Sequence, residues 1–505
     1  MNVKQWQVVD LPFDADQPAA QPFDIEFSAT FTSDGGDELT VPGFYDGDAR
    51  WVIRFSPPKT GDWTYTTRSD LASLNGRTGQ LTATPSTRPN QHGALGIDPD
   101  RPQHFAYEDG TPCMLLAYEA DWLFALDYDN PDDVPKTREL LDPLAEHGIN
   151  HVVTTVYSYD VEWDKDPKLA DHPEHEYGSL DRIYPFLGTN ADPDFANLNV
   201  TFFQRFDRIV EIMNELGLTA HLMIYVWNKR VNWPDADSDA DNRYFDYIIK
   251  RYQAFPNVVW NVSKEALNNP RCSEAYALER IDRVRRLDAY GRLVTVHDGG
   301  FCERNPDAVD FISWQNWSST LYTDTLRVLE KFPRLPVFNI EHGGYERSPY
   351  VVFTGDYTDP EVCLRRNWLL HFAGAYSTYY WQAAAWNVVI HDPFDQPDDW
   401  PRPMYAWYRH LADFFHRFPF AEFSPLPEKN FSGYCMHDGR DTWLYYLPKE
   451  NEKLSSWRWP DHLTSQWFNT LTGAYSDITP STPPYFVSPW RGEADAVLIC
   501  RSITN

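Results

Sequence analysis

The sequence predicts a multidomain α/β protein in which a central (β/α)8 TIM barrel lies between an N-terminal and a C-terminal β-sandwich. Within residues 98–420, eight short apolar runs alternate with segments of helical periodicity, the pattern of parallel strands joined by crossover helices. Residues 1–95 and 421–505 instead contain short segments in which apolar and polar residues alternate, separated by turn residues. We therefore expect three domains with these boundaries.

The N-terminal zone is expected to be a sandwich of the fibronectin or immunoglobulin type. Apolar and polar residues alternate in residues 23–31, 49–55 and 61–68, and Gly/Asp turn clusters at 34–37 and 46–48 separate them. Residues 84–93 form a polar segment that contains proline, which favours a domain boundary there.

The central zone carries the strands expected for a barrel. They are residues 113–118, 150–157, 219–227, 258–262, 293–297, 310–315, 337–340 and 377–382. Between them lie amphipathic segments such as residues 201–216, where apolar residues recur at three and four spacing and Gly217 supplies a helix stop. A Rossmann sheet would require a glycine-rich phosphate turn, and neither GxGxxG nor GxxxxGK[ST] occurs.

The C-terminal zone returns to β patterning. Residues 433–436, 442–447, 465–470 and 494–500 alternate or run apolar, with turn residues between them. We expect a second small sandwich over residues 421–505.

Composition excludes several classes of partner. The net charge of −30 on 505 residues would repel phosphates, so we expect no nucleic acid and no anionic membrane as partner. No apolar stretch reaches 18 residues, and the N-terminus lacks an apolar signal region, so we expect a cytoplasmic protein. The six cysteines are scattered without a CxxC pair, which favours free, buried thiols over a zinc site.

We expect neither a cofactor nor a metal. The only metal-like pattern is His172-Pro-Glu-His175 within an acidic segment, where a solvated loop is favoured over a cation site. The sequence has no HExxH pair, and no GxSxG nucleophile elbow that would indicate an esterase of the α/β-hydrolase type.

Two glutamates carry the functional prediction. Glu265 closes the apolar run of the fourth expected strand and Glu341 closes the seventh. In a barrel, residues at the carboxyl ends of the strands form the catalytic rim, and strands four and seven face each other across it. A pair of carboxyl groups over one cavity is what cleavage of a glycosidic bond requires.

Aromatic and polar residues near the expected strand ends favour a sugar cleft, because sugar faces stack on flat rings. Each alone is about as compatible with core packing or a supporting role. The candidate binding residues are Tyr118, Trp122, Tyr157, Trp227, Asn261, His297, Trp314, Gln315, Tyr345, Trp381 and Trp386.

The chain resembles the clan A retaining glycoside hydrolases, and more closely the apiosidase-like barrel family with an N-terminal β-sandwich domain of unknown function. Residues 30–36, 41–48 and 74–81 carry the likeness in the sandwich, and residues 105–112 carry it at the entry to the barrel. The family's spacing of a tryptophan five residues before the acid/base is kept by Trp260 and Glu265. The resemblance implies that Glu265 is the acid/base and Glu341 the nucleophile.

One departure from the family pattern concerns the residue before the acid/base. Many relatives have an asparagine that holds the sugar 2-hydroxyl, whereas this chain has Lys264. Because adjacent strand residues point to opposite faces, we expect the Lys264 side chain to point away from the cavity.

We therefore expect a retaining glycoside hydrolase that removes sugars from the ends of plant or algal oligosaccharides by double displacement. A transglycosidase on the same fold and a non-catalytic carbohydrate-binding protein are the alternatives. The sequence does not select the sugar, the linkage or the anomer, and it leaves homo-oligomerisation open.

Overall fold

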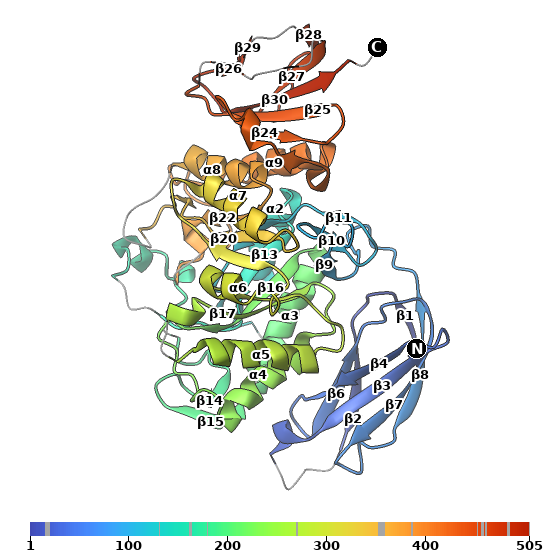
Figure 1. Cartoon of the computed structure of the whole chain (residues 1–505). Helices are drawn as coiled ribbons and strands as arrows, with labels where there is room; N and C mark the ends of the chain where they lie inside the picture. The colour runs from blue at the N-terminus through green and yellow to red at the C-terminus, as the bar shows by residue number, and fades with distance from the viewer. Residues whose placement is uncertain are drawn as a thin grey trace.

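The computed structural model describes residues 1–505 except 16–20, 131, 161–163, 179, 269–270, 352–358, 385–386, 452, 456–458, 460–461, 482–484 and 504–505. Three parts follow one another along the chain (Figure 1). An N-terminal pair of sheets packs against one side of a central barrel, and a C-terminal sheet domain packs against another.

The central part is a parallel barrel, as predicted. Among the described residues its strands are hydrogen-bonded in the order β18-β17-β16-β13-β12-β22-β20-β19, and every neighbouring pair is parallel. All eight expected runs are strands: β12 Leu116–Glu119, β13 His151–Thr155, β16 Thr219–Val226, β17 Val258–Lys264, β18 Val294–His297, β19 Ile312–Gln315, β20 Val337–Glu341 and β22 Tyr376–Trp381.

The two ends of this sheet meet through bonds just before β19. The amide of Asp310 donates to the carbonyl of Val294, at 3.0 Å, and the hydroxyl of Thr295 donates to the carbonyl of Phe311, also at 3.0 Å. These bonds join the segment that enters β19 to β18, so the barrel is nearly closed.

Helices surround the barrel on its outside (Figure 1). They are α1 Leu123–Leu126, α2 Pro135–Glu146, α3 Val200–Leu216, α4 Asp239–Tyr252, α5 Glu274–Leu287, α6 Gly299–Arg304, α7 Leu321–Lys331, α8 Pro360–Phe372 and α9 Tyr405–Arg417. The predicted helix 201–216 is confirmed as α3: the Asn199 side chain caps its first turn, and Gly217, at φ 74°, ends it in the left-handed region.

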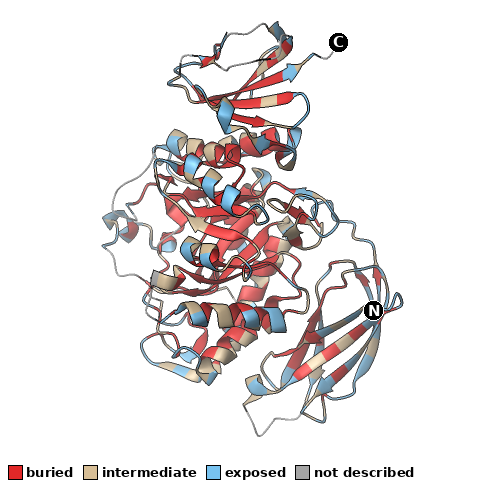
Figure 2. Cartoon of the chain, in the orientation of Figure 1, coloured by how far each residue is buried: buried red, intermediate tan, exposed pale blue. Residues whose placement is uncertain are grey.

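The barrel interior and the layer between strands and helices form one core (Figure 2). Every residue of β12, β13, β16, β17, β20 and β22 is buried. Strands covered on both faces read as continuous apolar runs, and that is why the sequence located them.

The N-terminal part is built from two antiparallel sheets around their own core, apart from the parallel pair β1–β8. The five-stranded sheet contains β1 Asn2–Lys4, β8 Thr78–Thr84, β7 Gly61–Ser69, β3 Phe27–Ser33 and β4 Glu38–Pro42. The three-stranded sheet contains β2 Val9–Asp14, β6 Arg50–Phe55 and β5 Phe44–Tyr45. This arrangement agrees with the sandwich predicted from period-two patterning.

Short sheets connect this domain to the barrel and decorate it. The strands β9 Leu95–Ile97, β10 Phe105–Tyr107 and β11 Pro112–Cys113 form an antiparallel sheet before β12. A hairpin of β14 Phe186–Gly188 and β15 Pro193–Leu198 precedes α3, and β21 Tyr345–Glu346 pairs with the end of β22.

The C-terminal part is a second sheet domain with a separate core. Its six-stranded sheet contains β23 Ser424–Pro425, β24 Tyr434–His437, β25 Thr442–Leu447, β30 Ala496–Ser502, β27 Leu463–Asn469 and β28 Thr479–Ser481. A pair of β26 Leu454–Ser455 and β29 Tyr485–Phe486 completes it. Trp368 of α8 stacks on Tyr446 of β25, with ring centroids 5.9 Å apart, and so ties this domain to the barrel.

Two predictions from composition can be compared directly with the structure. The six cysteines all lie in the described part of the chain, and each is buried and outside any disulfide, as expected. Among the described residues, none of the helices combines the length and the apolar character needed to cross a bilayer.

Candidate active site

A group of buried charged residues gathers at the carboxyl ends of the barrel strands. We call it the catalytic cluster: Glu119 at the end of β12, Asp121 just beyond it, Lys229 after β16, Lys264 and Glu265 at the end of β17, and Glu341 at the end of β20. All but Glu265 are almost completely buried. Charged groups are not buried together in a protein unless they pair or serve a ligand.

Glu341 is fixed by contacts to both of its carboxylate oxygens. The side chain is 2% exposed. The hydroxyl of Tyr345 donates a hydrogen bond to Oε1, and Lys264 Nζ lies 3.7 Å from Oε2. These two contacts hold the carboxylate in one orientation, as a nucleophile requires.

Glu265 has a different environment from Glu341. It stands one residue beyond β17 with φ 51°, and its amide donates to the carbonyl of His297 at 3.1 Å. Burial raises the pKa of Glu265; Lys264 opposes this shift, Glu341 adds to it, and Lys229 and a hydrogen bond from Asn228 oppose it. The balance lies above the ordinary value, which suits a group that must hold a proton near neutral pH.

The prediction that Lys264 points away from the cavity is wrong. Its ammonium lies 2.5 Å from Glu119 Oε1 and 3.7 Å from both Asp121 Oδ2 and Glu341 Oε2. The register between β17 and β18 shifts between Asn261 and Lys264, so the simple alternation of side chains does not hold there. Because Glu265 then adopts a left-handed conformation, both neighbours can contribute to one pocket.

Glu119, Asp121 and Lys229 belong to the same buried cluster, and the sequence analysis did not single them out as candidates. Lys229 Nζ lies 3.7 Å from Asp121 Oδ2, and both side chains are fully buried. A signal was available, because Glu119 and Asp121 follow the first expected strand in the way that Glu265 and Glu341 follow the fourth and seventh. Burial raises the pKa of Glu119 well above its ordinary value, Lys264 opposes the shift, and Asp121 and Glu341 add to it.

Several buried polar atoms here have no hydrogen-bond partner among the described residues. They are Oε2 of Glu119, both carboxylate oxygens of Asp121, Oε2 of Glu341, the hydroxyl of Tyr380 and both amide atoms of Gln382. The lysine contacts of Asp121 and Glu341, at 3.7 Å, exceed hydrogen-bonding distance. Buried polar groups are normally satisfied, so this concentration points to a ligand rich in hydroxyl groups.

Some predicted binding residues lie at this rim. Tyr345 contacts Glu341 directly, and its ring meets the edges of Tyr380 and of Trp317, which is 44% exposed. Gln315 is the cross-strand partner of Glu341. His297, the cross-strand partner of Lys264, is buried, and neither ring nitrogen has a hydrogen-bond partner in the described part of the chain.

Two further predicted residues are half-buried near the strand ends. Trp227 follows β16 and stacks on Tyr225, with ring centroids 5.0 Å apart. Trp314 is the penultimate residue of β19 and lies close against Gly299 at the start of α6. Trp227 therefore follows the strand that leads to Lys229, and Trp314 lies on the strand that pairs with that of Glu341.

Other predicted binding residues are packed within the core. Tyr118 points to the helix layer, where its ring packs on Tyr379 and its hydroxyl accepts a hydrogen bond from Tyr405 of α9 at 3.3 Å. Tyr157 lies among aromatic rings that include Tyr184 and Trp233. Their contacts are explained by core packing.

Trp122, Trp381 and Asn261 are likewise buried away from solvent. Trp122 packs on Phe124, and Trp381 donates from its indole to the carbonyl of Arg347 at 3.2 Å. Asn261 contacts His221 at 3.0 Å and accepts from the amide of His297, also at 3.0 Å, so it supports the strands. Trp386 lies outside the described residues.

Comparison with known proteins gives matches along most of the chain. A family model described as "Apiosidase-like, catalytic domain" matches residues 100–421. A second model, described as a domain of unknown function (DUF5060), matches residues 2–70. No curated protein matches the chain significantly.

Solved structures share the architecture. A candidate glycoside hydrolase from Bacteroides vulgatus ATCC 8482 superposes with a TM-score of 0.78 at 21% identity, over 99% of this chain and 100% of that one. A glycoside hydrolase family 5 structure from the same organism gives 0.60 at 16% identity, over 82% of this chain and 93% of that one. At these identities the likeness shows the fold.

Proposed function

The chain belongs to the apiosidase-like family and is a glycoside hydrolase, and from that premise we propose that it works by retaining double displacement. Glu341 is the nucleophile and Glu265 the acid/base. The assignment rests on the different contacts of the two glutamates and on the raised pKa of Glu265, which suits the acid/base. Glu341 receives a hydroxyl hydrogen bond and a lysine contact, whereas burial raises the pKa of Glu265.

The reaction has two steps. In the first, a carboxylate oxygen of Glu341 attacks the anomeric carbon while the bond to the leaving oxygen breaks and Glu265 gives that oxygen its proton. In the second, Glu265 takes a proton from water, and the water oxygen attacks the anomeric carbon as the bond to Glu341 breaks. The released sugar therefore has the anomeric configuration of the substrate.

We propose that Lys264 supports this chemistry by balancing the charge of the neighbouring carboxyl groups. Its ammonium lies near Glu119, Asp121 and Glu341, so it offsets the repulsion between these three carboxyl groups. The hydroxyl of Tyr345 orients the other carboxylate oxygen of Glu341, Oε1.

We propose that the substrate enters as a chain end. Glu341 is 2% exposed, and Glu119 and Asp121 are fully buried, so little of the cluster is open to solvent, which favours a terminal sugar over the middle of a long chain. The unpaired oxygens of Glu119 and Asp121 would accept hydrogen bonds from the hydroxyls of one terminal sugar. Aryl apiosides and plant or algal oligosaccharides are therefore the first substrates to test.

The observation that supports the proposal is the group of buried polar atoms without hydrogen-bond partners beside Glu341, among the described residues, at the strand ends that also carry Glu265. The test is a substrate screen with wild type, Glu265→Ala and Glu341→Ala, with proton NMR of the anomer first released. We expect retention in wild type, a loss of about 10⁴-fold or more in Glu341→Ala, and rescue of Glu265→Ala by azide on an activated aryl glycoside.

Two results would contradict this proposal. Activity that survives both substitutions would mean that the reaction takes place elsewhere. First release of the inverted anomer would show that Glu341 activates water and forms no covalent bond to the sugar.

A further inference from the structure

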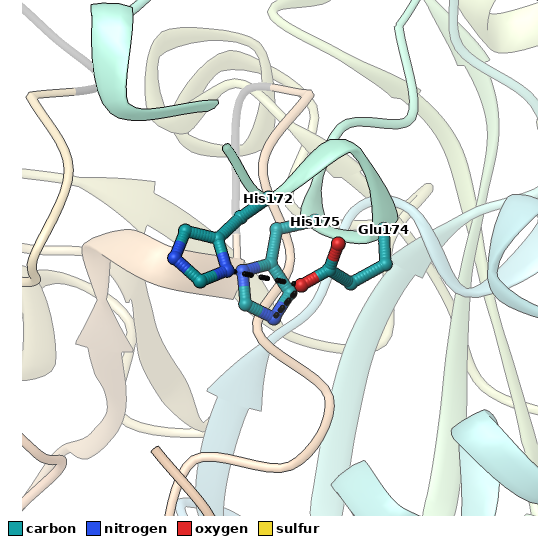
Figure 3. Close-up of side chains that lie close together, drawn as sticks. All are labelled: His172, Glu174 and His175. Carbon is teal, nitrogen blue, oxygen red and sulfur yellow. Dashed lines mark hydrogen bonds and ion pairs between the residues drawn. The ribbon is translucent and has the colours of Figure 1, made fainter. Parts of the chain in front are cut away.

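A second cluster of ionisable side chains lies outside the catalytic cluster, in the segment between β13 and β14. His172, Glu174 and His175 belong to one short turn of 3-10 helix, Pro173–His175, and its preceding residue. Figure 3 shows the two imidazole rings and the carboxylate converging on one point. The sequence favoured a solvated loop here, but His175 is only 1% exposed.

The spacing of the potential ligand atoms is that of a metal's coordination shell. His172 Nδ1 lies 3.1 Å from Glu174 Oε1, and His175 Nε2 lies 3.9 Å from the same oxygen. One donor atom from each residue can be chosen so that all three lie within 4.8 Å of one another. Ligands about 2.0–2.1 Å from a tetrahedral Zn²⁺ are themselves about 3.4 Å apart, so the side chains, whose imidazole planes are now within 12° of parallel, would rotate to take up an ion.

The surroundings of His175 prepare it for this role. The Nδ1 atom of His175 is hydrogen-bonded to the hydroxyl of Tyr350 at 2.8 Å, which leaves Nε2 facing the carboxylate. Metal-binding histidines generally hold such a partner on the other ring nitrogen.

Two neighbouring side chains supply further donor atoms. Asp392 Oδ1 lies 3.7 Å from His175 Nε2. The Nε2 atom of His391 is buried without a hydrogen-bond partner in the described part of the chain, and its ring centroid is 6.1 Å from that of His175. Glu174 also lines a surface cavity of about 590 Å³, which gives an ion a route in from solvent.

We propose that His172, Glu174 and His175 bind a divalent transition-metal ion, best matched by Zn²⁺, with Asp392 available as a fourth ligand. Two imidazole nitrogens with one or two carboxylates suit zinc in preference to calcium or magnesium, which take oxygen ligands. The proposal adds a binding site to the proposed glycosidase and does not depend on its mechanism.

The position of the cluster indicates a structural role for the ion. His175 belongs to the segment after β13, Tyr350 to the segment after β20, and Asp392 to the segment after β22. The backbone already joins the first and third segments, since the amide of Val389 donates to the carbonyl of His175 at 3.0 Å. All three segments follow the carboxyl ends of barrel strands. The ion would therefore link the segments after β13 and β22 directly, and the segment after β20 through Tyr350, at the same end of the barrel as the catalytic cluster.

The direct test is titration of the EDTA-treated full chain with Zn²⁺ by calorimetry, followed by thermal unfolding with and without the metal. We expect one equivalent to bind, with an upward shift of the unfolding midpoint. The variants His172→Gln and Glu174→Gln should each lose at least about 100-fold in affinity. His92→Gln is the matched control, because His92 also pairs with a carboxylate, Asp109, at 2.8 Å, and that variant should bind as wild type does.

A second variant separates a metal site from general damage to the loop. Tyr350→Phe removes only the hydroxyl that faces Nδ1 of His175, and it should weaken Zn²⁺ binding by roughly 10–100-fold without removing it. Co²⁺ in place of Zn²⁺ should give the visible absorption of a tetrahedral site in wild type and not in His172→Gln. The proposal is overturned if wild type binds no Zn²⁺, or if His172→Gln and Glu174→Gln bind it as tightly as wild type does.

Discussion

Lys264 carries the positive charge that three carboxylates of the catalytic cluster share. Glu119, Asp121 and Glu341 all lie within 3.7 Å of its ammonium. Burial opposes its charge, but these three anions outweigh that effect and raise the pKa of Lys264 well above its ordinary value. The shift favours the charged form of Lys264.

Replacing Lys264 by methionine should have two effects at once. Activity should fall by about 100-fold, because Glu119 and Glu341 would lose the cation that they share and Asp121 would keep only Lys229. The alkaline limb of the kcat/KM profile should move to higher pH, since Lys264 now lowers the pKa of Glu265. Lys59→Met, at an exposed N-terminal lysine, is the control. An unchanged alkaline limb would show that Lys264 does not act on the acid/base.

Tyr345 gives a second test at the same carboxylate. Tyr345→Phe removes the hydrogen bond to Glu341 Oε1 and leaves the ring to pack on Tyr380. We expect kcat to fall about 10-fold with little change in KM, because the bond orients the nucleophile more than it holds the substrate. A rise in KM at constant kcat would instead make Tyr345 a substrate contact.

The sequence located only part of this site, for identifiable reasons. Glu265 and Glu341 could be predicted because each ends an apolar run, and the end of a barrel strand is a functional position. The direction of Lys264 could not be predicted, because a register shift between β17 and β18 disturbs the alternation of side chains. Tyr118 was grouped with the binding residues, but one residue of offset on β12 turns it toward the helices while Glu119 turns inward.

At the scale of elements, the segment after β20 is anchored by a buried carboxyl group. Glu346 in β21 accepts a hydrogen bond from the amide of Met404, at 3.1 Å, where α9 is about to begin. Burial raises the pKa of Glu346 to about 8 from 4.5, although a hydrogen bond from Tyr379 and the Met404 amide oppose the shift. The folded protein therefore favours the protonated form of the Glu346 carboxyl group.

Because of this raised pKa, the free energy of unfolding should decrease as the pH rises. The folded pKa lies above the unfolded value, so the stability due to Glu346 is fully present below about pH 4.5 and is lost as pH rises toward 8. Glu346→Gln should remove that loss and raise the free energy of unfolding at pH 8 by roughly 3 kcal/mol. Denaturant titrations of both proteins at pH 5 and pH 8 measure the effect. Equal pH dependence in the two would contradict the assignment.

Elements were the most predictable level of this fold. The eight barrel strands were found because parallel strands covered on both faces are continuous apolar runs. Short pairings such as β21, with two residues, and the hairpin β14–β15 carry no comparable pattern and were not predicted. These short strands form because of contacts with the barrel, and such long-range contacts leave no signal in the order of apolar and polar residues.

At the scale of the whole molecule, a buried ion network joins the N-terminal sheets to the barrel. Arg54 of β6 is paired with Asp10 at 2.7 Å and with Asp207 of α3 at 2.9 Å, and it also donates to the carbonyl of Arg251 at 3.1 Å. The guanidinium is 3% exposed, so no water can take over these contacts.

Arg54→Met should destabilise the contact between the N-terminal sheets and the barrel by about 3 kcal/mol, because Asp207 loses one of the two arginines that compensate its burial. The matched control is Arg50→Met on the same strand, where the pair with Asp14 is exposed and worth less than about 1 kcal/mol. Chemical unfolding monitored by circular dichroism compares the two. Equal effects would mean that the network does not join the domains.

The measurement that tests the central claim most directly is the mass of the glycosyl-enzyme. An activated aryl glycoside, chosen from the screen, should leave Glu265→Ala with the glycosyl group still attached, because deglycosylation lacks its base. Peptide mapping should place the added mass on Glu341. A label on Glu119 or Asp121, or turnover without any covalent adduct, would contradict the double-displacement mechanism proposed for this pocket.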